Sequence, residues 1–162
     1  DKRDSVSLIR YADDFVILHK DLTVVQGCRI IISEWLQDMG LELKPNKTRL
    51  AHTLYKYEDG NAGFNFLGFH IQQFNVGKYT TGKDTKGNRL GFKTIINPSK
   101  EKCKIHCDSI KKVINSCRGC SQHRLIERLN PIIRGWCNYY SIISNIRVFS
   151  KIDAWIYTSL SN

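Results

Sequence analysis

The hydrophobic pattern of this sequence changes its period near Pro98. Before Pro98, short β-rich runs alternate with turns, and residues 22–39 repeat apolar side chains at helical spacing. From Ser99 onward, apolar residues recur every three or four positions to the C-terminal end. This change predicts an α+β fold with two domains: an antiparallel sheet with a packed helix over residues 1–97, then an all-helical bundle over residues 98–162.

Short segments define the elements expected in the first domain. Residues 5–10 and 15–19 are typical of two strands around a tight turn, and Asp21 offers an N-cap for a helix that ends at Gly40. The apolar stripe of this helix contains Val25, Cys28, Ile32, Trp35 and Met39. The later segments are strand–turn–strand over 40–53 with the turn at Pro45-Asn46, β structure over 64–74, a mobile loop or hairpin tip over 75–89, and a last strand over 90–96.

The second domain is expected to contain helices alone. One helix extends from a Ser99 cap to about Arg118, with Gly119 as its stop. A second begins near Ser121, and Asn130-Pro131 is interpreted as a cap with a first-turn proline that restarts a helix. The apolar sides of the remaining helical segments contain Ile132, Trp136 and Tyr140, and then Phe149, Ile152, Ile156 and Leu160.

The net charge of +10 comes from one part of the chain. Residues 78–134 contain fourteen Lys or Arg against four Asp or Glu, whereas the rest carries eleven of each sign. A basic segment beside a neutral one indicates a surface that binds a polyanion. A solvated surface that only confers solubility is the alternative. No run of about eighteen apolar residues occurs, so no membrane span is expected.

Six cysteines raise the question of a zinc site. Cys117-x-x-Cys120 with His123, and a second group around His106, resemble zinc ligands in their spacing. However, one apolar stripe at helical spacing contains Cys103, Cys107, Ile110, Ile114 and Cys117. A free cysteine in such a stripe behaves as a small hydrophobic residue. We therefore expect core cysteines in a reduced, intracellular chain rather than a metal site.

The segment Tyr11-Ala12-Asp13-Asp14 lies at a turn between two hydrophobic strands. Two adjacent carboxylates repel each other unless a cation compensates, and Mg²⁺ prefers oxygen ligands and bridges to phosphates. Two-metal phosphoryl transfer uses rigidly held carboxylates, so that the ions stabilise both the attacking and the leaving oxygen. We therefore predict that Asp13 and Asp14 are catalytic Mg²⁺ ligands. The alternative is that the pair serves only as turn residues.

The YADD segment resembles the catalytic hairpin of reverse transcriptases, and the motifs after it resemble that family in the same order. Residues 40–48, GLELKPNKT, are similar to the next palm motif, in which the residue matching Lys47 lies near the incoming nucleotide. Residues 66–69, FLGF, resemble the primer-grip hairpin, and residues 97–100, NPSK, resemble the start of the thumb. Residues 129–140, LNPIIRGWCNYY, closely resemble the thumb and maturase signature of group II intron proteins.

The resemblance implies that the intact protein synthesises DNA on an RNA template. Asp13 and Asp14 would hold two Mg²⁺ ions, and dNTPs would be substrates. The site for nucleotide and primer would contain Tyr11, Ala12 and Lys47, and the primer grip would contain Phe66, Leu67, Gly68 and Phe69. Residues 1–97 would be the C-terminal part of the palm, and residues 98–162 the thumb or maturase domain.

The resemblance also implies RNA partners. The thumb would grip the duplex of RNA template and DNA primer, and would bind the group II intron RNA as a maturase in a ribonucleoprotein. A helix with one buried side and a basic side can follow a phosphate backbone. The predicted RNA-binding residues are Lys100, Lys102, Lys104, Lys111, Lys112, Arg118, Arg124, Arg128 and Arg134. Trp136, Tyr139 and Tyr140 are interpreted as core residues, with base stacking as the alternative.

Members of this family need a third metal-binding Asp from an earlier strand and fingers that close on the nucleotide, and neither precedes Asp1. The sequence opens inside a charged segment without Met, and no Cys/His-rich endonuclease module follows Asn162. We therefore expect a piece of a longer protein that does not polymerise DNA by itself, in a cytoplasmic or organellar ribonucleoprotein. The alternatives are a non-enzymatic RNA-binding splicing cofactor and another bacterial-type reverse transcriptase, such as a retron or CRISPR-linked enzyme.

Overall fold

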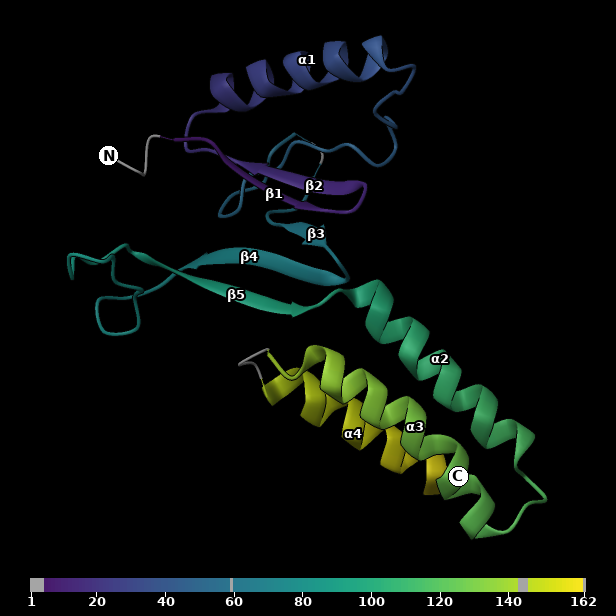
Figure 1. Cartoon of the computed structure of the whole chain (residues 1–162). Coiled ribbons are helices and arrows are strands. Elements are labelled where there is room, and N and C mark those ends of the chain that lie inside the picture. The colour runs from purple at the N-terminus through teal and green to yellow at the C-terminus, as the bar shows by residue number, and fades with distance from the viewer. Residues whose placement is uncertain (1–4, 59, 143–145, 162) are drawn as a thin grey trace. The chain divides into compact units, whose positions relative to one another are not determined.

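The computed structural model describes residues 5–58, 60–142 and 146–161 (Figure 1). The chain forms two compact units, Asp1–Ala51 and His52–Asn162. The first unit holds a β-hairpin and one helix, and the second holds a three-stranded sheet followed by helices. The change from strands to helices falls just after Pro98, where the sequence predicts it. An α+β fold is therefore confirmed.

The elements of the first unit are β1 (Ser7–Tyr11), β2 (Asp14–Leu18) and α1 (Leu22–Asp38). The two strands are antiparallel, with Tyr11 opposite Asp14 across a two-residue turn. The Asp21 carboxylate caps α1 by accepting hydrogen bonds from the Thr23 hydroxyl at 2.8 Å and from the Thr23 N–H at 2.9 Å. The bond from the hydroxyl, and then the bond from the N–H, lower the pKa of Asp21. Gly40 follows the helix with a φ of 71°. The predicted strands, N-cap and glycine stop are all present.

The buried side of α1 differs from the predicted stripe at its C-terminal end. The first three residues of that stripe are partly buried, but Trp35 and Met39 are exposed. Leu36 is partly buried instead. Three turns of 3.6 residues from Val25 lead to position 36 rather than 35, so the period itself explains the correction.

Residues 41–50 contain no strand, which corrects the predicted strand–turn–strand. The turn is present, because the N–H groups of Lys47 and Thr48 both donate to the Lys44 carbonyl, at 3.0 and 2.9 Å. Pro45 has no N–H to offer a neighbouring strand. The N–H groups of Lys47 and Thr48 are thus used inside the turn, and Pro45 has none, so these three residues cannot donate to a neighbouring strand.

The sheet of the second unit is antiparallel, in the order β3–β4–β5. Its strands are β3 (Phe64–Phe66), β4 (Phe69–Asn75) and β5 (Phe92–Pro98). On the side of β4 that faces β3, the loop at Thr53 also pairs with β4, because the Gln73 N–H donates to the Thr53 carbonyl at 2.8 Å. Between β4 and β5, residues 76–91 form the predicted loop, in which Asp84 accepts hydrogen bonds from the N–H groups of Lys86 and Asn88.

The helices of the second unit are α2 (Lys100–Ser116), α3 (Gln122–Tyr140) and α4 (Ile146–Ser161). Ser99 and Ser121 cap α2 and α3 with their hydroxyl oxygens, as predicted. Helix α2 packs against both α3 and α4. The buried apolar residues of these helices are Ile110, Cys117, Leu129, Tyr140 and Ile152. Among the described residues, no helix is long and apolar enough to cross a membrane.

Pro131 lies inside α3, so the prediction that Asn130-Pro131 caps and restarts a helix is wrong. A proline in a helix interior removes one backbone hydrogen bond, here to the Glu127 carbonyl, at roughly 3 kcal/mol. Leu129 is buried before the proline and Tyr140 after it. We attribute the continuity of α3 to this packing on both sides, which outweighs the local loss.

The core position of Ile110 gives the first testable prediction. Ile110 is 0% exposed, whereas Ile105 on the same helix is 52% exposed. Ile110→Ala should lower the free energy of unfolding by about 2–5 kcal/mol, because it leaves a cavity in a packed core. The matched control, Ile105→Ala, should change it by less than about 1 kcal/mol. Denaturant titration followed by helical circular dichroism measures both, and equal effects would contradict the packing described here.

Candidate functional site

The tip of the β1–β2 hairpin carries the two predicted catalytic carboxylates. Ala12 and Asp13 form its two-residue turn, and Asp14 is the first residue of β2. Ala12 has a φ of 53°, which a non-glycine residue adopts at a penalty of about 1 kcal/mol or more. Arg10 supports the tip by donating from Nε to the Ala12 carbonyl at 2.8 Å. Tyr11, Ala12, Asp13 and Asp14 are all exposed.

The carboxylates fit the requirements of a hard divalent cation. Asp13 and Asp14 are adjacent and exposed on a constrained turn. Mg²⁺ is commonly bound through one or two carboxylates, with water and substrate phosphates completing its shell. Among the described residues, no cluster of three or more His, Cys, Asp or Glu side chains could hold a metal. The role of Asp13 and Asp14 as Mg²⁺ ligands thus stays a prediction.

Lys47, predicted near the incoming nucleotide, is exposed on the turn after α1. Its backbone N–H is fixed by the Lys44 carbonyl at 3.0 Å, which leaves its ammonium group on the surface of the first unit. The hairpin tip and the Lys47 turn thus belong to the same unit.

The predicted primer-grip residues form a second tight hairpin, between β3 and β4. Phe66 pairs with Phe69 across the turn residues Leu67 and Gly68. The φ values of Leu67 and Gly68 are 50° and 80°, the pattern of a type I′ turn. A Cβ at Gly68 would meet the Tyr140 hydroxyl at 2.9 Å, so this position also requires glycine for space.

Two tyrosines from the end of α3 hold this second turn. The Tyr139 hydroxyl donates to the Leu67 carbonyl at 2.8 Å, and the Tyr140 hydroxyl donates to the Gly68 carbonyl at 3.3 Å. The Phe69 ring stacks on Tyr139, with 5.5 Å between centroids, and meets Tyr140 edge-on at 5.0 Å. Burial raises the pKa of Tyr140. Tyr140 is thus a core residue, as the sequence predicts. The same prediction for Tyr139 is wrong, because its side chain is 54% exposed.

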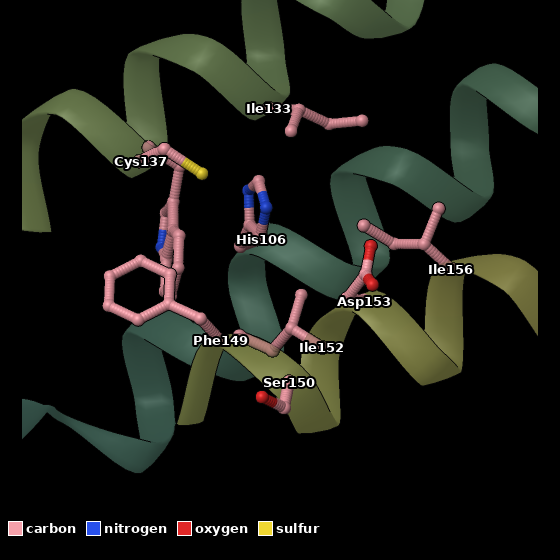
Figure 2. A pocket seen from close by; sticks show the side chains of 9 residues that line it. His106, Ile133, Cys137, Phe149, Ser150, Ile152, Asp153 and Ile156 are labelled. Atoms are coloured by element: carbon pink, nitrogen blue, oxygen red, sulfur yellow. The ribbon is translucent and has the colours of Figure 1, made fainter. Parts of the chain in front are cut away.

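Further along α3, Trp136 belongs to an aromatic cluster between the helices. Its ring stacks on His106 of α2, with centroids 4.6 Å apart, and meets Phe149 of α4 edge-on at 5.4 Å. Trp136 is half-buried, and its Nε1 has no hydrogen-bond partner among the described residues. An open cavity of about 290 Å³ adjoins this cluster. Figure 2 shows His106 among Ile133, Cys137, Ile152 and other lining side chains of the three helices.

The predicted RNA-binding lysines of α2 are all exposed and lie outside its cysteine stripe, on the surface that forms the lysine side of the helix. The predicted RNA-binding arginines are exposed as well. The exposed set contains Lys100, Lys102, Lys104, Lys111, Lys112, Arg118, Arg124, Arg128 and Arg134. The opposite side of α2 is the cysteine stripe, in which Cys117 is buried and Cys103 and Cys107 are partly buried. Burial raises the pKa of both Cys103 and Cys107, as expected for core thiols.

Arg128 differs from the other cations because it bonds inward. Its Nη1 donates to Ser116 Oγ and to Cys117 Sγ, each at 3.1 Å, which ties α3 back to the end of α2. Burial raises the pKa of Cys117, but hydrogen bonds with Arg128, Cys120 and Ser116, together with the charge of Arg128, outweigh it, and the pKa lies below the usual thiol value. The described cysteines are all free thiols.

Two family models match different parts of the chain. Residues 1–71 match the model of the reverse transcriptase (RNA-dependent DNA polymerase) family, and residues 104–162 match the maturase-specific domain of group II introns. Over 66 residues the chain is 35% identical to an uncharacterized 59.8 kDa protein in psbD intron 8 of Euglena gracilis. That match covers 40% of this chain and 12% of the relative.

The first match, which contains the YADD hairpin, places the chain among the reverse transcriptases. The second match is specific to intron proteins. Taken together, they show that the chain belongs to the group II intron reverse transcriptase and maturase family. The family that the motifs resemble is thus confirmed.

The sequence predicts the motifs but not two of their contacts: that of Tyr139 with the FLGF turn, and that of His106 with Trp136. Nothing in the periodicity of α3 indicates that Tyr139 reaches the FLGF turn, because the two are 72 residues apart in sequence. His106 was considered only as a possible zinc ligand, although it stands three residues after Cys103, on the same helix face. Gly68 was the available signal, since a glycine in a hairpin turn often marks a close approach.

The buried His106 predicts a pH dependence of stability. Burial lowers its pKa from the ordinary value of 6.5. The unfolded chain therefore binds this proton more readily, and the stability that His106 contributes is complete above pH 6.5 and is lost as pH falls through its lower, folded-state pKa. Unfolding free energies of the unaltered chain should decline between about pH 7 and pH 5. His106→Phe, which retains a ring against Trp136, should decline less.

The control for this experiment is the exposed His123 of α3, which pairs with Glu127 at 3.3 Å on the surface. His123→Gln should show the same pH dependence as the unaltered chain. Parallel curves for the unaltered chain and His106→Phe would show that His106 is not the group responsible.

Proposed function

We propose that this chain is the palm and thumb part of an RNA-directed DNA polymerase that also binds its intron RNA as a maturase. The observation that carries the proposal is the YADD turn inside the reverse transcriptase match, in one chain with the maturase match. Residues 1–97 would complete the palm, and residues 98–162 would form the thumb. The YADD turn points to nucleotidyl transfer, and the maturase match points to a group II intron as the RNA partner.

In this proposal, Asp13 and Asp14 hold two Mg²⁺ ions in the intact enzyme. Bound Mg²⁺ would stabilise the negative charge on the attacking 3′ oxygen of the primer and on the leaving pyrophosphate. The chain's own part is to hold the carboxylates rigidly, which the two-residue turn and the Arg10 hydrogen bond support. The exposed ring of Tyr11 would contact the primer or the nucleotide base, and the Lys47 ammonium would attract the phosphates of the dNTP.

Removing one carboxylate tests the polymerase assignment. In the full-length protein, Asp13→Ala should reduce primer extension on an RNA template by at least about a hundredfold, because a lost metal ligand removes several kcal/mol of transition-state stabilisation. Affinity for intron RNA should stay the same. Asp38→Ala, which removes an exposed carboxylate at the end of α1, is the matched control and should extend normally.

The possible outcomes distinguish a polymerase from a non-enzymatic splicing cofactor. Near-normal extension by Asp13→Ala would refute the catalytic role of the YADD turn. If the unaltered full-length protein binds and splices intron RNA but never extends a primer, it is a non-enzymatic splicing cofactor instead.

For RNA binding, we propose that the lysine side of α2 follows the phosphate backbone of the intron RNA and of the template–primer duplex. Its lysines are exposed, and the opposite side of the helix packs against α3 and α4. Each phosphate neutralised by a lysine releases a bound counterion, so such an interface is strongly salt-dependent.

Replacing Lys104, Lys111 and Lys112 together with Ala should weaken intron RNA binding and reduce the slope of log K against log salt by roughly one unit per lost phosphate contact. Fold stability should not change, because all three side chains are exposed. The control removes equal charge elsewhere, from the exposed Lys44, Lys56 and Lys151, and should leave the slope nearly intact. Equal losses in both triple variants would indicate a general charge effect rather than an interface on α2.

A further inference from the structure

The carbonyl oxygens of the β3–β4 turn are bonded almost entirely by donors from the helical part of the second unit. Tyr139 of α3 donates to the Leu67 carbonyl. The Gly68 carbonyl accepts two hydrogen bonds, from the Tyr140 hydroxyl at 3.3 Å and from the Ser99 N–H at the start of α2 at 2.8 Å. A hairpin turn normally leaves such carbonyls to water, so this turn is fixed to the helices rather than by the sheet alone.

We infer that Tyr139 and Tyr140 are positioning residues for the 3′ end of the primer. They couple the turn of the grip hairpin to α3, so that the helices that bind the duplex also set the position of the hairpin that steadies the primer. The inference rests on the proposed polymerase function, and it adds to it a specific role for the two tyrosines at the end of the maturase helix.

The rings and the hydroxyls of the two tyrosines act on the hairpin in different ways. Phe69 contacts both rings, which fixes the side chain next to the turn. The hydroxyls fix the turn backbone itself. A Phe substitution removes only the hydroxyl and retains the ring, so it separates backbone positioning from aromatic packing.

A cation lies beside the same turn. A Cβ built on Gly68 would lie 3.5 Å from Lys102 Cγ and 3.6 Å from Lys102 Cε, so the Lys102 stem runs along the turn. Lys102 is exposed on the first turn of α2, next to the Ser99 cap. A phosphate of the primer backbone at the hairpin tip would therefore lie close to the Lys102 ammonium group.

The experiment uses the full-length protein with Tyr139→Phe, Tyr140→Phe and both together. The control is Tyr157→Phe on α4, whose side chain is 74% exposed. Primer extension is measured at saturating dNTP, with KM for the primer–template duplex and kcat determined separately. The double variant should lose about tenfold in kcat, because the turn that steadies the primer end loses the two hydroxyl hydrogen bonds that position its backbone. Intron RNA affinity, KM for the duplex and melting temperature should change little.

Hydrogen exchange of the Ser99 amide gives a readout that does not depend on activity. Its hydrogen bond to the Gly68 carbonyl weakens if the turn loosens, so exchange should become about fivefold faster or more in the double variant and stay unchanged in Tyr157→Phe.

Each possible result either supports the positioning role of the two tyrosines or contradicts it. Unchanged kcat in the double variant, with an active unaltered enzyme, would overturn the inference and leave the polymerase function standing. A lower melting temperature with unchanged kcat would assign the hydroxyls to stability and also overturn it. If the unaltered protein extends no primer, the proposed function fails, and the positioning role fails with it.

Discussion

The junction between the Leu67-Gly68 turn and the end of α3 is the contact on which the second unit depends. The peptide carbonyls of a tight turn need donors, and here two tyrosine hydroxyls and one backbone N–H at the start of a helix supply them. The glycine is required twice, for its φ of 80° and for the space that Tyr140 occupies. The junction therefore links strand pairing, helix capping and aromatic packing at one point.

The two hairpins of the chain show opposite uses of a two-residue turn. The β1–β2 tip is bonded locally, through Arg10, and it leaves the side chains of Asp13 and Asp14 exposed. Its residue with a positive φ is Ala12, whose methyl group is too short to cover the carboxylates. The β3–β4 tip is bonded over 72 residues of sequence. The exposed β1–β2 tip suits the proposed role of its carboxylates, which would bind a cation and substrate. The β3–β4 tip suits the proposed primer grip, whose position would have to be fixed.

Most of the secondary structure could be predicted because local signals were strong. The Asp21, Ser99 and Ser121 caps and the switch of period at Pro98 are encoded by neighbouring residues, and the structure contains each of them. The errors arose where tertiary packing outweighs a local preference, as at Pro131, or where β-like composition has no partner strand, as in residues 41–50. The YADD site could be recognised because its residues are contiguous. The tyrosine contacts could not, because they join segments far apart in sequence.

Helix α2 connects the basic surface to this junction. Its cysteine side is apolar and partly buried, and this burial raises the pKa of Cys103 and Cys107. Its lysine side begins beside the Gly68 turn, at Lys102. In the proposed interface, a phosphate backbone that follows these lysines toward the N-terminal end of α2 would reach the β3–β4 turn, to which Ser99, Tyr139 and Tyr140 donate hydrogen bonds. The proposed grip on the nucleic acid and the proposed placement of the primer end would therefore share α2 and α3 as their support.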